Sequence, residues 1–435
     1  MEWWITLIIL GGVLLAVLLS GVPVAFAFLS LNIIGFVGWV GGVESLSLLV
    51  PSAYSSISIF TLVAVPLFIF LGEAFFYLGL GKLMLDNIGK WIGRLPGSLG
   101  LLGMCSGAVF GMMSGSSVSG VALFGSTLVP EMKSRGYGNQ MIYGPILAAG
   151  SLAVIIPPSL LVVVLATLTQ QSVGELLIAT TVPGFVLAAL YAAYVLVRGH
   201  IQPHLAPPFG PSHVDWSERI KSLVYILPFS ILIFLVLGVI FLGIATPTEA
   251  ASLGATGVIG LSAAYGKLSW QAIKRALMDT VSVTSMVLLI FMSASAFAQL
   301  LAITGASREL GNLIVGLPIS PILKIICMQV VLIIMGMFID DWSVLMITVP
   351  IFFPVICSLG FDPVWFSILL LVNMEMAAIS PPFGLLLFTL KGVVPSANMR
   401  DIWRGAIPFL FIILLLLIML FIFPSLATFL PGLMR

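Results

Sequence analysis

Long apolar segments, separated by short polar stretches, dominate the pattern of this 435-residue chain. A helix needs about 20 predominantly apolar residues to cross a hydrocarbon core of about 30 Å. Segments that approach or exceed this length lie near residues 3–20, 23–41, 62–80, 140–168, 173–197, 222–243, 247–265, 279–303, 364–390 and 405–424. The serine-rich residues 44–60 are less apolar and are expected at the membrane interface. The pattern predicts an all-α, polytopic membrane protein.

Two pairs of shorter apolar segments interrupt this series: residues 97–113 pair with 117–130, and residues 320–337 pair with 342–357. A helix of about 14 residues rises only about 21 Å, which is too little to span the hydrocarbon core. The first pair meets at a stretch of glycines and serines, residues 111–120. This stretch alone fits two structures equally well: a re-entrant hairpin whose tip reaches mid-membrane, or a helix pair that kinks at a glycine-rich packing site.

The basic residues help to choose between these structures, because cytoplasmic loops of membrane proteins are enriched in Lys and Arg. One assignment places 14 of the 17 Lys and Arg residues in the cytoplasm and leaves only Arg308, Lys324 and Arg435 outside. It requires both short pairs to be re-entrant, the first from the cytoplasm and the second from the opposite side. It also makes residues 81–96 and 131–139 cytoplasmic loops, and it places both termini on the periplasmic side.

An internal repeat supports the same topology. Four prolines recur after 224 residues, as the pairs Pro23 and Pro247, Pro130 and Pro354, Pro157 and Pro381, and Pro158 and Pro382. Two copies of inverted topology are typical of secondary transporters. The first inverted repeat is predicted to cover residues 1–197, with a re-entrant hairpin at 97–130 and a broken helix at 140–168. A cytoplasmic linker is predicted at 198–221. The second inverted repeat is predicted to cover residues 222–435, with a hairpin at 320–357 and a broken helix at 364–390.

Each repeat supplies a hairpin tip and a helix broken by two consecutive prolines. Proline lacks a backbone donor and disfavours helix at the preceding residue, so we expect free carbonyls at Ala153, Ile156 and Ser380. Oxygen ligands of this kind suit a hard cation such as Na⁺, and the N-termini of the following half-helices suit an anion. One proline pair alone would be a passive kink, but its recurrence beside a short hairpin favours a binding site.

A carboxylate at membrane depth is energetically costly when it is charged and unpaired, so each one is expected to have a binding, capping or hydrogen-bonding role. Asp340 and Asp341 stand at the second predicted tip, where they either bind a cation or cap the helix that follows. Glu249 is expected to cap the start of its own helix. Glu73 and Glu375 are expected to form interhelical hydrogen bonds, with proton or cation binding as the alternative.

Composition narrows the function. The chain is 60% hydrophobic and 8% charged with a formal net charge of +1, which argues against a soluble domain and against a nucleic-acid partner. The three cysteines lack metal-binding spacing, and the three histidines all lie in the linker, so no haem or zinc site is expected in the membrane. The chain carries no nucleotide-binding motif, so an ion gradient is the expected energy source.

Several motifs together resemble the large membrane subunit (DctM type) of the tripartite ATP-independent periplasmic (TRAP) transporters, over essentially the whole chain. They are Gly21–Val–Pro–Val–Ala–Phe26, Ser114–Gly–Ser–Ser117, Ile156–Pro–Pro–Ser159, Gly243–Ile–Ala–Thr–Pro–Thr–Glu249, Gly336–Met–Phe–Ile–Asp340, Ser380–Pro–Pro–Phe–Gly384 and Arg404–Gly–Ala–Ile–Pro408. The resemblance implies an elevator-type transporter, in which a mobile domain of hairpins and broken helices slides against a scaffold. It implies a non-enzymatic symporter of the bacterial inner membrane that takes up a small organic anion with Na⁺.

The resemblance also implies partners and binding residues. The partners are a small four-helix membrane subunit (DctQ type) and a periplasmic substrate-binding protein (DctP type). Matched by motif, the implied residues are Ser114, Ala153, Ile156 and Pro157 for one Na⁺ site, Gly336, Ala377, Ser380 and Phe383 for the other, and Ser116, Ser117 and Asp340 for substrate. The family usually has glycine where this chain has Ala153 and Ala377, but main-chain ligation tolerates the change.

Three other kinds of membrane protein compete with this interpretation. The nearest is a stand-alone cation-coupled carrier of a related inverted-repeat family, which would lack the small subunit. The others are a membrane subunit of a redox complex, which would need cofactor ligands in its spans, and a channel, which would conduct ions without a binding protein.

Overall fold

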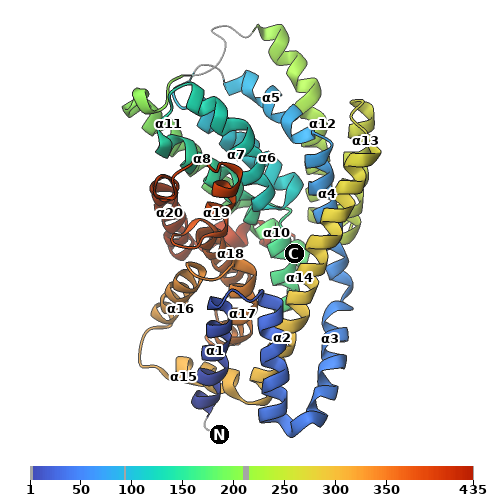
Figure 1. The fold of residues 1–435 in the computed structure, drawn as a ribbon, viewed down its shortest axis with the longest axis vertical. Helices are drawn as coiled ribbons and strands as arrows, with labels where there is room; N and C mark the ends of the chain where they lie inside the picture. The colour runs from blue at the N-terminus through green and yellow to red at the C-terminus, as the bar shows by residue number, and fades with distance from the viewer. Residues whose placement is uncertain (1–2, 93–94, 209–214, 435) are drawn as a thin grey trace.

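The computed structural model describes residues 3–92, 95–208 and 215–434, and these are helical almost throughout (Figure 1). Within them, seven helical stretches are long and apolar enough to cross a membrane, and five shorter apolar helices accompany them. The prediction of an all-α, multi-pass membrane protein is therefore confirmed.

The chain begins with helix α1 (Trp3–Leu19) and continues into a helical stretch of 34 residues. That stretch comprises α2 (Val24–Gly35), π- and 3₁₀-helical turns over residues 36–48, and α3 (Leu49–Ile57). The sequence predicted a helix end near residue 41 and a separate segment after it. The structure instead keeps a helical path there, because irregular turns take up the two glycines at positions 41 and 42.

Helix α5 (Leu80–Ile92) occupies most of the region predicted as the cytoplasmic loop 81–96, so the prediction of a loop was wrong. Its buried residues include Leu80, Met84 and Leu85, which share one face because helix neighbours recur every three to four positions. Lys82 is exposed on another face. The charges suggested a loop, whereas the amphipathic spacing forms a surface helix. Residues 93–94 of the predicted loop lie outside the described residues.

Both pairs of short segments form helical hairpins. The arms of the first are α6 (Ser98–Ser114) and α7 (Ser117–Ser134), and those of the second are α16 (Pro321–Gly336) and α17 (Asp341–Ser358). Helix α7 continues beyond Pro130, where the first hairpin was expected to end. Proline is tolerated inside a membrane helix that its neighbours support, and α7 packs against α6 and α8.

Both segments with paired prolines form broken helices. The flanking half-helices are α8 (Asn139–Ser151) and α9 (Leu160–Thr169) in the first, and α18 (Pro363–Ile379) and α19 (Leu385–Val393) in the second. In both segments the helix ends before the proline pair, as the missing backbone donors require. The predicted ranges are therefore correct to within a few residues.

The remaining helices are α4 (Ala64–Tyr77), α10 (Val173–Ala179), α11 (Thr181–Ile201), α12 (Trp216–Phe241), α13 (Pro247–Ala264), α14 (Trp270–Ile303), α15 (Ala306–Gly316), α20 (Met399–Ile422) and α21 (Ser425–Gly432). Helices α11 and α12 extend into the predicted linker 198–221 from its two ends. Residues 209–214 of that linker lie outside the described residues. Glu249 forms a capping box with Thr246 at the start of α13, as predicted.

The two hairpins are approached from opposite ends of the molecule. In Figure 1, α5 and the beginning of α12 lie at the upper end of the long axis, whereas α15 and the beginning of α1 lie at the lower end. Helix α5 leads into the first hairpin, and α15 leads into the second. The C-terminus lies near the middle of the long axis.

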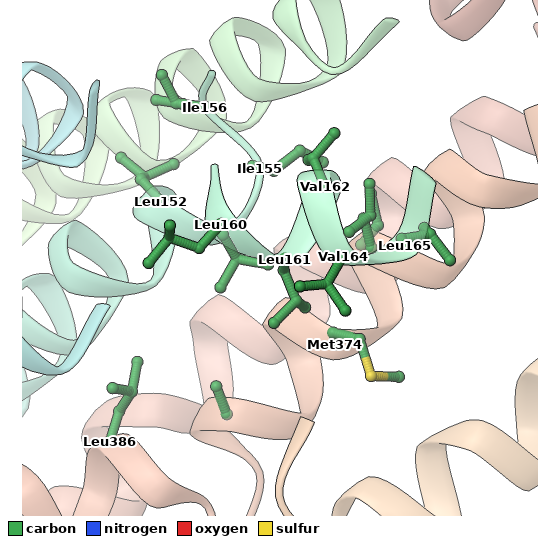
Figure 2. Close-up of a cluster of buried hydrophobic side chains, with 14 of the residues drawn as sticks. Leu152, Ile155, Ile156, Leu160, Leu161, Val162, Val164, Leu165, Met374 and Leu386 are labelled. Carbon is green, nitrogen blue, oxygen red and sulfur yellow. The ribbon is translucent and has the colours of Figure 1, made fainter. Parts of the chain in front are cut away.

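The half-helix α9 is buried from Leu160 to Ala166. Figure 2 shows its residues Leu160, Leu161, Val162, Val164 and Leu165 in a cluster with Met374 of α18 and Leu386 of α19. A helix that is apolar on every face is suited only to a fully enclosed position. The first broken helix therefore packs against the second.

The sequence repeat corresponds to a repeat of helical elements. The corresponding ends are Ser117 and Asp341 at the start of α7 and α17, Ser134 and Ser358 at their ends, and Asn139 and Pro363 at the start of α8 and α18. Ser151 and Glu375 are also 224 positions apart, and the Ser151 hydroxyl donates a 2.9 Å hydrogen bond to the Glu375 carboxylate. One pair of corresponding residues is thus in direct contact.

Helices α8 and α20 should be sensitive to a single methyl group where they cross. A Cβ on Gly144 would lie 2.5 Å from the carbonyl oxygen of Gly405. We expect Gly144→Ala to destabilise the protein by about 1–3 kcal/mol, because a backbone atom cannot move aside as a side chain can. Thermal unfolding of the purified protein in detergent provides the measurement.

The control is Gly260→Ala in α13, because no atom lies within 4 Å of a Cβ built on Gly260. Alanine in an open helical position is favoured over glycine by up to about 1 kcal/mol, so this variant should unfold no earlier than the wild type. A Gly144→Ala protein as stable as the wild type would contradict the close crossing.

Candidate functional site

A cavity of about 830 Å³ is lined by both hairpin tips. Its lining includes Ser114, Ser116 and Ser117 of the first tip and Asp340 and Asp341 of the second. Helices α4 and α14 form a further wall, and the start of α9 also contributes. The structure therefore brings the three predicted substrate residues, Ser116, Ser117 and Asp340, to one cavity.

The first tip is a tight turn between α6 and α7. Gly115 ends α6 with a φ of 56°, a left-handed conformation that favours glycine. Ser116 then caps α7, because its hydroxyl accepts a hydrogen bond from the Ser119 amide at 3.3 Å. The Ser114 hydroxyl is buried and accepts the Ser116 amide at 3.3 Å. The hydroxyl groups of the tip are thus held by the turn itself.

Helix α4 presses directly on this tip. A Cβ on Gly72 would lie 2.4 Å from the Cα and 2.5 Å from the carbonyl oxygen of Ser114. Only glycine permits this approach, so Gly72 positions Ser114. Sequence reasoning missed Gly72 because a single glycine in an apolar span carries no local signal.

The first helix break exposes backbone carbonyls within the protein. Ala153 and Ile156 are fully buried, and their carbonyl oxygens accept no hydrogen bond from any residue that the structure describes. The prolines at 157 and 158 remove the amides that would otherwise pair with them. A Cβ on Gly111 of α6 would lie 3.1 Å from the Ala153 Cα, so the break lies against the hairpin. The predicted free carbonyls of Ala153 and Ile156 are confirmed.

The second break differs in one respect. The Ser380 carbonyl, which was predicted to be free, accepts the Gly384 amide at 2.9 Å, so that prediction was wrong. The carbonyls of Ala378 and Ile379 are among those that accept no hydrogen bond from the described residues. The turn after Pro382 folds back far enough for Gly384 to reach Ser380, and this shifts the free oxygens towards the helix end.

The other predicted residues of the second site meet around this break. A Cβ on Gly336 would lie 2.4 Å from the Ala377 Cβ, and the Phe383 amide donates a 3.3 Å hydrogen bond to the Met337 carbonyl. The Ser380 hydroxyl donates to the Met376 carbonyl at 2.7 Å. The second tip therefore packs onto its broken helix at Gly336, as the first does at Gly111.

The two aspartates of the second tip have different environments. The Asp340 carboxylate caps α17 by accepting the Ser343 amide at 3.1 Å. Asp341 is only 6% exposed, and its Oδ1 atom has no hydrogen-bond partner among the described residues. Capping, one of the two predicted roles, thus holds for Asp340, while Asp341 is left with an unpaired oxygen.

The wall formed by α4 and α14 carries further acidic and phenolic groups. Glu73 of α4 accepts a 3.3 Å hydrogen bond from the Ser119 hydroxyl of α7, so its predicted interhelical bond is confirmed. Tyr77, one turn further along α4, donates a hydrogen bond to Asp279 of α14. Glu73, Tyr77 and Asp279 all line the cavity. Sequence reasoning missed Tyr77 and Asp279, although an aspartate at the edge of an apolar segment is a usable signal.

Glu375 does not line the cavity and lies in the core between α18, α8 and α11. It is fully buried, and its carboxylate accepts hydrogen bonds from the hydroxyls of Ser151 at 2.9 Å and Tyr191 at 3.3 Å. This confirms the prediction of interhelical hydrogen bonding for Glu375. The contact joins α18 to α8 and α11.

Comparison with known proteins places this fold. The sequence model of the family described as "Tripartite ATP-independent periplasmic transporter, DctM component" matches residues 11–426. The C4-dicarboxylate TRAP transporter large permease protein DctM of Rhodobacter capsulatus is 30% identical, over 98% of this chain and 99% of that protein. The isethionate TRAP transporter permease protein DctMQ of Oleidesulfovibrio alaskensis is 28% identical, over 98% of this chain and 66% of that protein.

A solved structure shares the fold. The YdaH transporter of Alcanivorax borkumensis superposes with a TM-score of 0.61 and 14% identity, over 94% of this chain and 98% of that one. The helical architecture and the matched sequences define a multi-pass membrane protein of the transporter permease class. Within that class, the chain belongs to the DctM component family of the tripartite ATP-independent periplasmic transporters.

Neutralising the two tip aspartates should have opposite effects on stability. A charged carboxylate costs more to bury than a neutral amide of the same shape, so we expect Asp341→Asn to raise the melting temperature in Na⁺-free buffer. Asp340→Ala should lower it, because loss of a helix cap costs about 1 kcal/mol. Differential scanning fluorimetry of the purified variants provides the comparison, and a destabilised Asp341→Asn protein would show that its carboxylate is paired.

Proposed function

We propose that this protein couples the uptake of a small organic anion to the inward flow of Na⁺. The observation that carries the proposal is the meeting of two hairpin tips and two broken helices, with unpaired buried carbonyls beside both tips. Unpaired carbonyls are costly away from water, and a bound hard cation would satisfy them. The protein performs no chemical step in this proposal and acts as a symporter.

Each cation site would combine a hairpin end with a helix break. The first would use Ser114 with the main chain at Ala153, Ile156 and Pro157. The second would use Gly336 with Ala377, Ser380 and Phe383, and the free carbonyls of the second break add oxygens from Ala378 and Ile379. In the second site Ser380 would contribute through its hydroxyl or its remaining lone pair, because its carbonyl already accepts one hydrogen bond.

The substrate carboxylate would bind at the first tip. Ser116 and Ser117 line the cavity at the N-terminus of α7, and Leu160 lines it at the N-terminus of α9. Helix N-termini attract anions through their free amides and the helix dipole. Asp340 lines the same cavity. It would orient the substrate by contacting groups of the substrate other than the substrate's carboxylate.

The repeat of elements supports the inverted repeats and an elevator movement. Helices α7 and α17 correspond end to end, and the hairpins are approached from opposite ends of the molecule. The contact between Ser151 and Glu375, at corresponding positions, fits a pseudo-two-fold axis that passes near them. In this proposal the hairpins and broken helices move together past α2, α4, α13 and α14.

The proposed setting is a bacterial inner membrane with both termini in the periplasm. The proposed partners are a DctQ-type small subunit and a DctP-type substrate-binding protein. The relative named DctMQ is longer than this chain, and its additional segment fits a permease that works with a small subunit. Co-purification of a small membrane subunit would separate this assignment from a stand-alone carrier.

Na⁺ itself is the sharpest probe, because it requires no knowledge of the substrate. We expect NaCl to raise the melting temperature of the purified protein while KCl at equal ionic strength does not. A Na⁺ concentration of about 100 times the dissociation constant would add about 2.7 kcal/mol to the free energy of unfolding. Ser114→Ala should weaken this response, because it removes a proposed ligand.

Ser106→Ala is the matched control for Ser114→Ala, because Ser106 is a buried serine of the same helix whose hydroxyl has no partner among the described residues. It should respond to NaCl as the wild type does. Equal stabilisation of the wild type by NaCl and KCl would reject Na⁺ binding at these sites.

The inverted topology has its own test. Ser134 and Ser358 end α7 and α17 at corresponding positions, and both are exposed. In a protein whose three native cysteines are replaced by serine, Ser134→Cys should react with an impermeant maleimide only from the cytoplasmic side. Ser358→Cys should react only from the periplasmic side. Labelling of both from one side would contradict inverted repeats.

A further inference from the structure

The cavity between the hairpin tips is acidic. Four carboxylates line it: Glu73 from α4, Asp279 from α14, and Asp340 and Asp341 from the second tip. None of the described lining residues is Lys, Arg or His. This composition is unexpected for a cavity that serves an organic anion alone.

No basic side chain of the described residues lies within ion-pair distance of these carboxylates. Arg275, one turn before Asp279 on α14, is exposed and does not line the cavity. Two proposed Na⁺ ions would offset part of the negative charge, and a dianionic substrate would restore it.

Two of the carboxylates form a pair on the wall made by α4 and α14, which adjoins the first tip because Ser119 donates a hydrogen bond to Glu73. Tyr77 follows Glu73 by one turn of α4 and donates a hydrogen bond to Asp279, so Glu73 and Asp279 occupy neighbouring positions on this wall. Each keeps one carboxylate oxygen that no hydrogen bond of the described residues engages. This pair is a natural contact for a cationic group.

Asp341 independently indicates a missing partner. It lines the cavity, and only 6% of its surface is exposed. Its Oδ1 atom has no hydrogen-bond partner among the described residues. A buried carboxylate is tolerated when it is paired or hydrogen-bonded. A ligand that carries N–H donors or a positive charge would supply what Asp341 lacks.

The cavity thus offers groups that suit both signs of charge, and the two kinds adjoin where Ser119 donates a hydrogen bond to Glu73. The serines and helix N-termini of the first tip suit a carboxylate, and the Glu73–Asp279 wall with Asp341 suits a cation. We propose that the transported substrate is a small zwitterion, whose carboxylate binds the first tip and whose cationic nitrogen faces Glu73, Asp279 and Asp341. This inference rests on the proposed function and narrows it: the substrate keeps the carboxylate of the proposed organic anion, and a cationic nitrogen balances its charge.

Four probes that share a short carbon chain separate the possibilities. They are γ-aminobutyrate together with its N-trimethyl derivative, glutarate, in which a second carboxylate replaces the nitrogen, and butyrate, which lacks the cation. Calorimetric binding to the purified protein in nanodiscs with NaCl is the measurement. We expect at least one zwitterion to bind about tenfold or more tightly than glutarate and butyrate.

Tighter or equal binding of glutarate overturns the inference, and so does the absence of binding by both zwitterions. These failures are distinct from failure of the proposed function. Glutarate that binds in NaCl but not in KCl would leave Na⁺-coupled anion transport intact. Carboxylate binding that is indifferent to Na⁺ would instead reject the proposed coupling.

Variants test which groups hold the cation. Asp279→Asn and Glu73→Gln should each weaken zwitterion binding about tenfold while leaving butyrate binding unchanged or stronger. Glu44→Gln is the matched control, because Glu44 is exposed and does not line the cavity. An intact stabilisation by NaCl shows that a variant is folded. Equal losses for zwitterion and butyrate would assign these carboxylates a merely structural role and overturn the inference.

Discussion

The fold depends on the need to satisfy backbone carbonyls where helices break inside a membrane. Lipid offers no donor, and each unpaired group in an apolar setting costs several kcal/mol, so a break must be enclosed by protein or bind a ligand. The first break is enclosed, because Ala153, Ile156 and the residues of α9 from Leu160 to Ala166 are buried. The second break is open on one side, where Phe383 is 55% exposed. Each hairpin lies against a break through a glycine, Gly111 at the first break and Gly336 at the second. The carbonyls that remain unpaired lie beside the hairpin tips, where a bound ion would be sheltered from lipid.

The sequence predicted the features that depend on local chain properties. Arms too short to span a bilayer predicted the hairpins, and paired prolines predicted the breaks and the free carbonyls of Ala153 and Ile156. Features that depend on distant contacts were not predictable. The Ser380 carbonyl is occupied because the chain folds back at Gly384, and α5 forms because its apolar face packs on neighbouring helices. Gly72 gained its role only through the position of Ser114, which lies far along the chain.

The charges illustrate the same limit. Asp340 could be predicted to cap α17 because it directly precedes that helix, but the contrast with the adjacent Asp341 required the packing around each side chain. Likewise, Glu73 and Asp279 come from helices that lie far apart in the sequence. Their pairing on one wall emerges from the packing of α4 against α14, which no local pattern encodes.

The division of the cavity between two structural groups has a consequence for transport. The serines of the first tip belong to the hairpins, whereas Glu73, Tyr77 and Asp279 belong to the helices proposed as the scaffold. The 3.3 Å hydrogen bond between Ser119 and Glu73 crosses that boundary, and a sliding movement would have to break it. A zwitterion that bridges the two walls would stabilise the position seen here, and an elevator movement would require release of its cationic end. The scaffold carboxylates would then affect the rate of movement as well as substrate choice, because they would contact the substrate in one position of the mobile domain only.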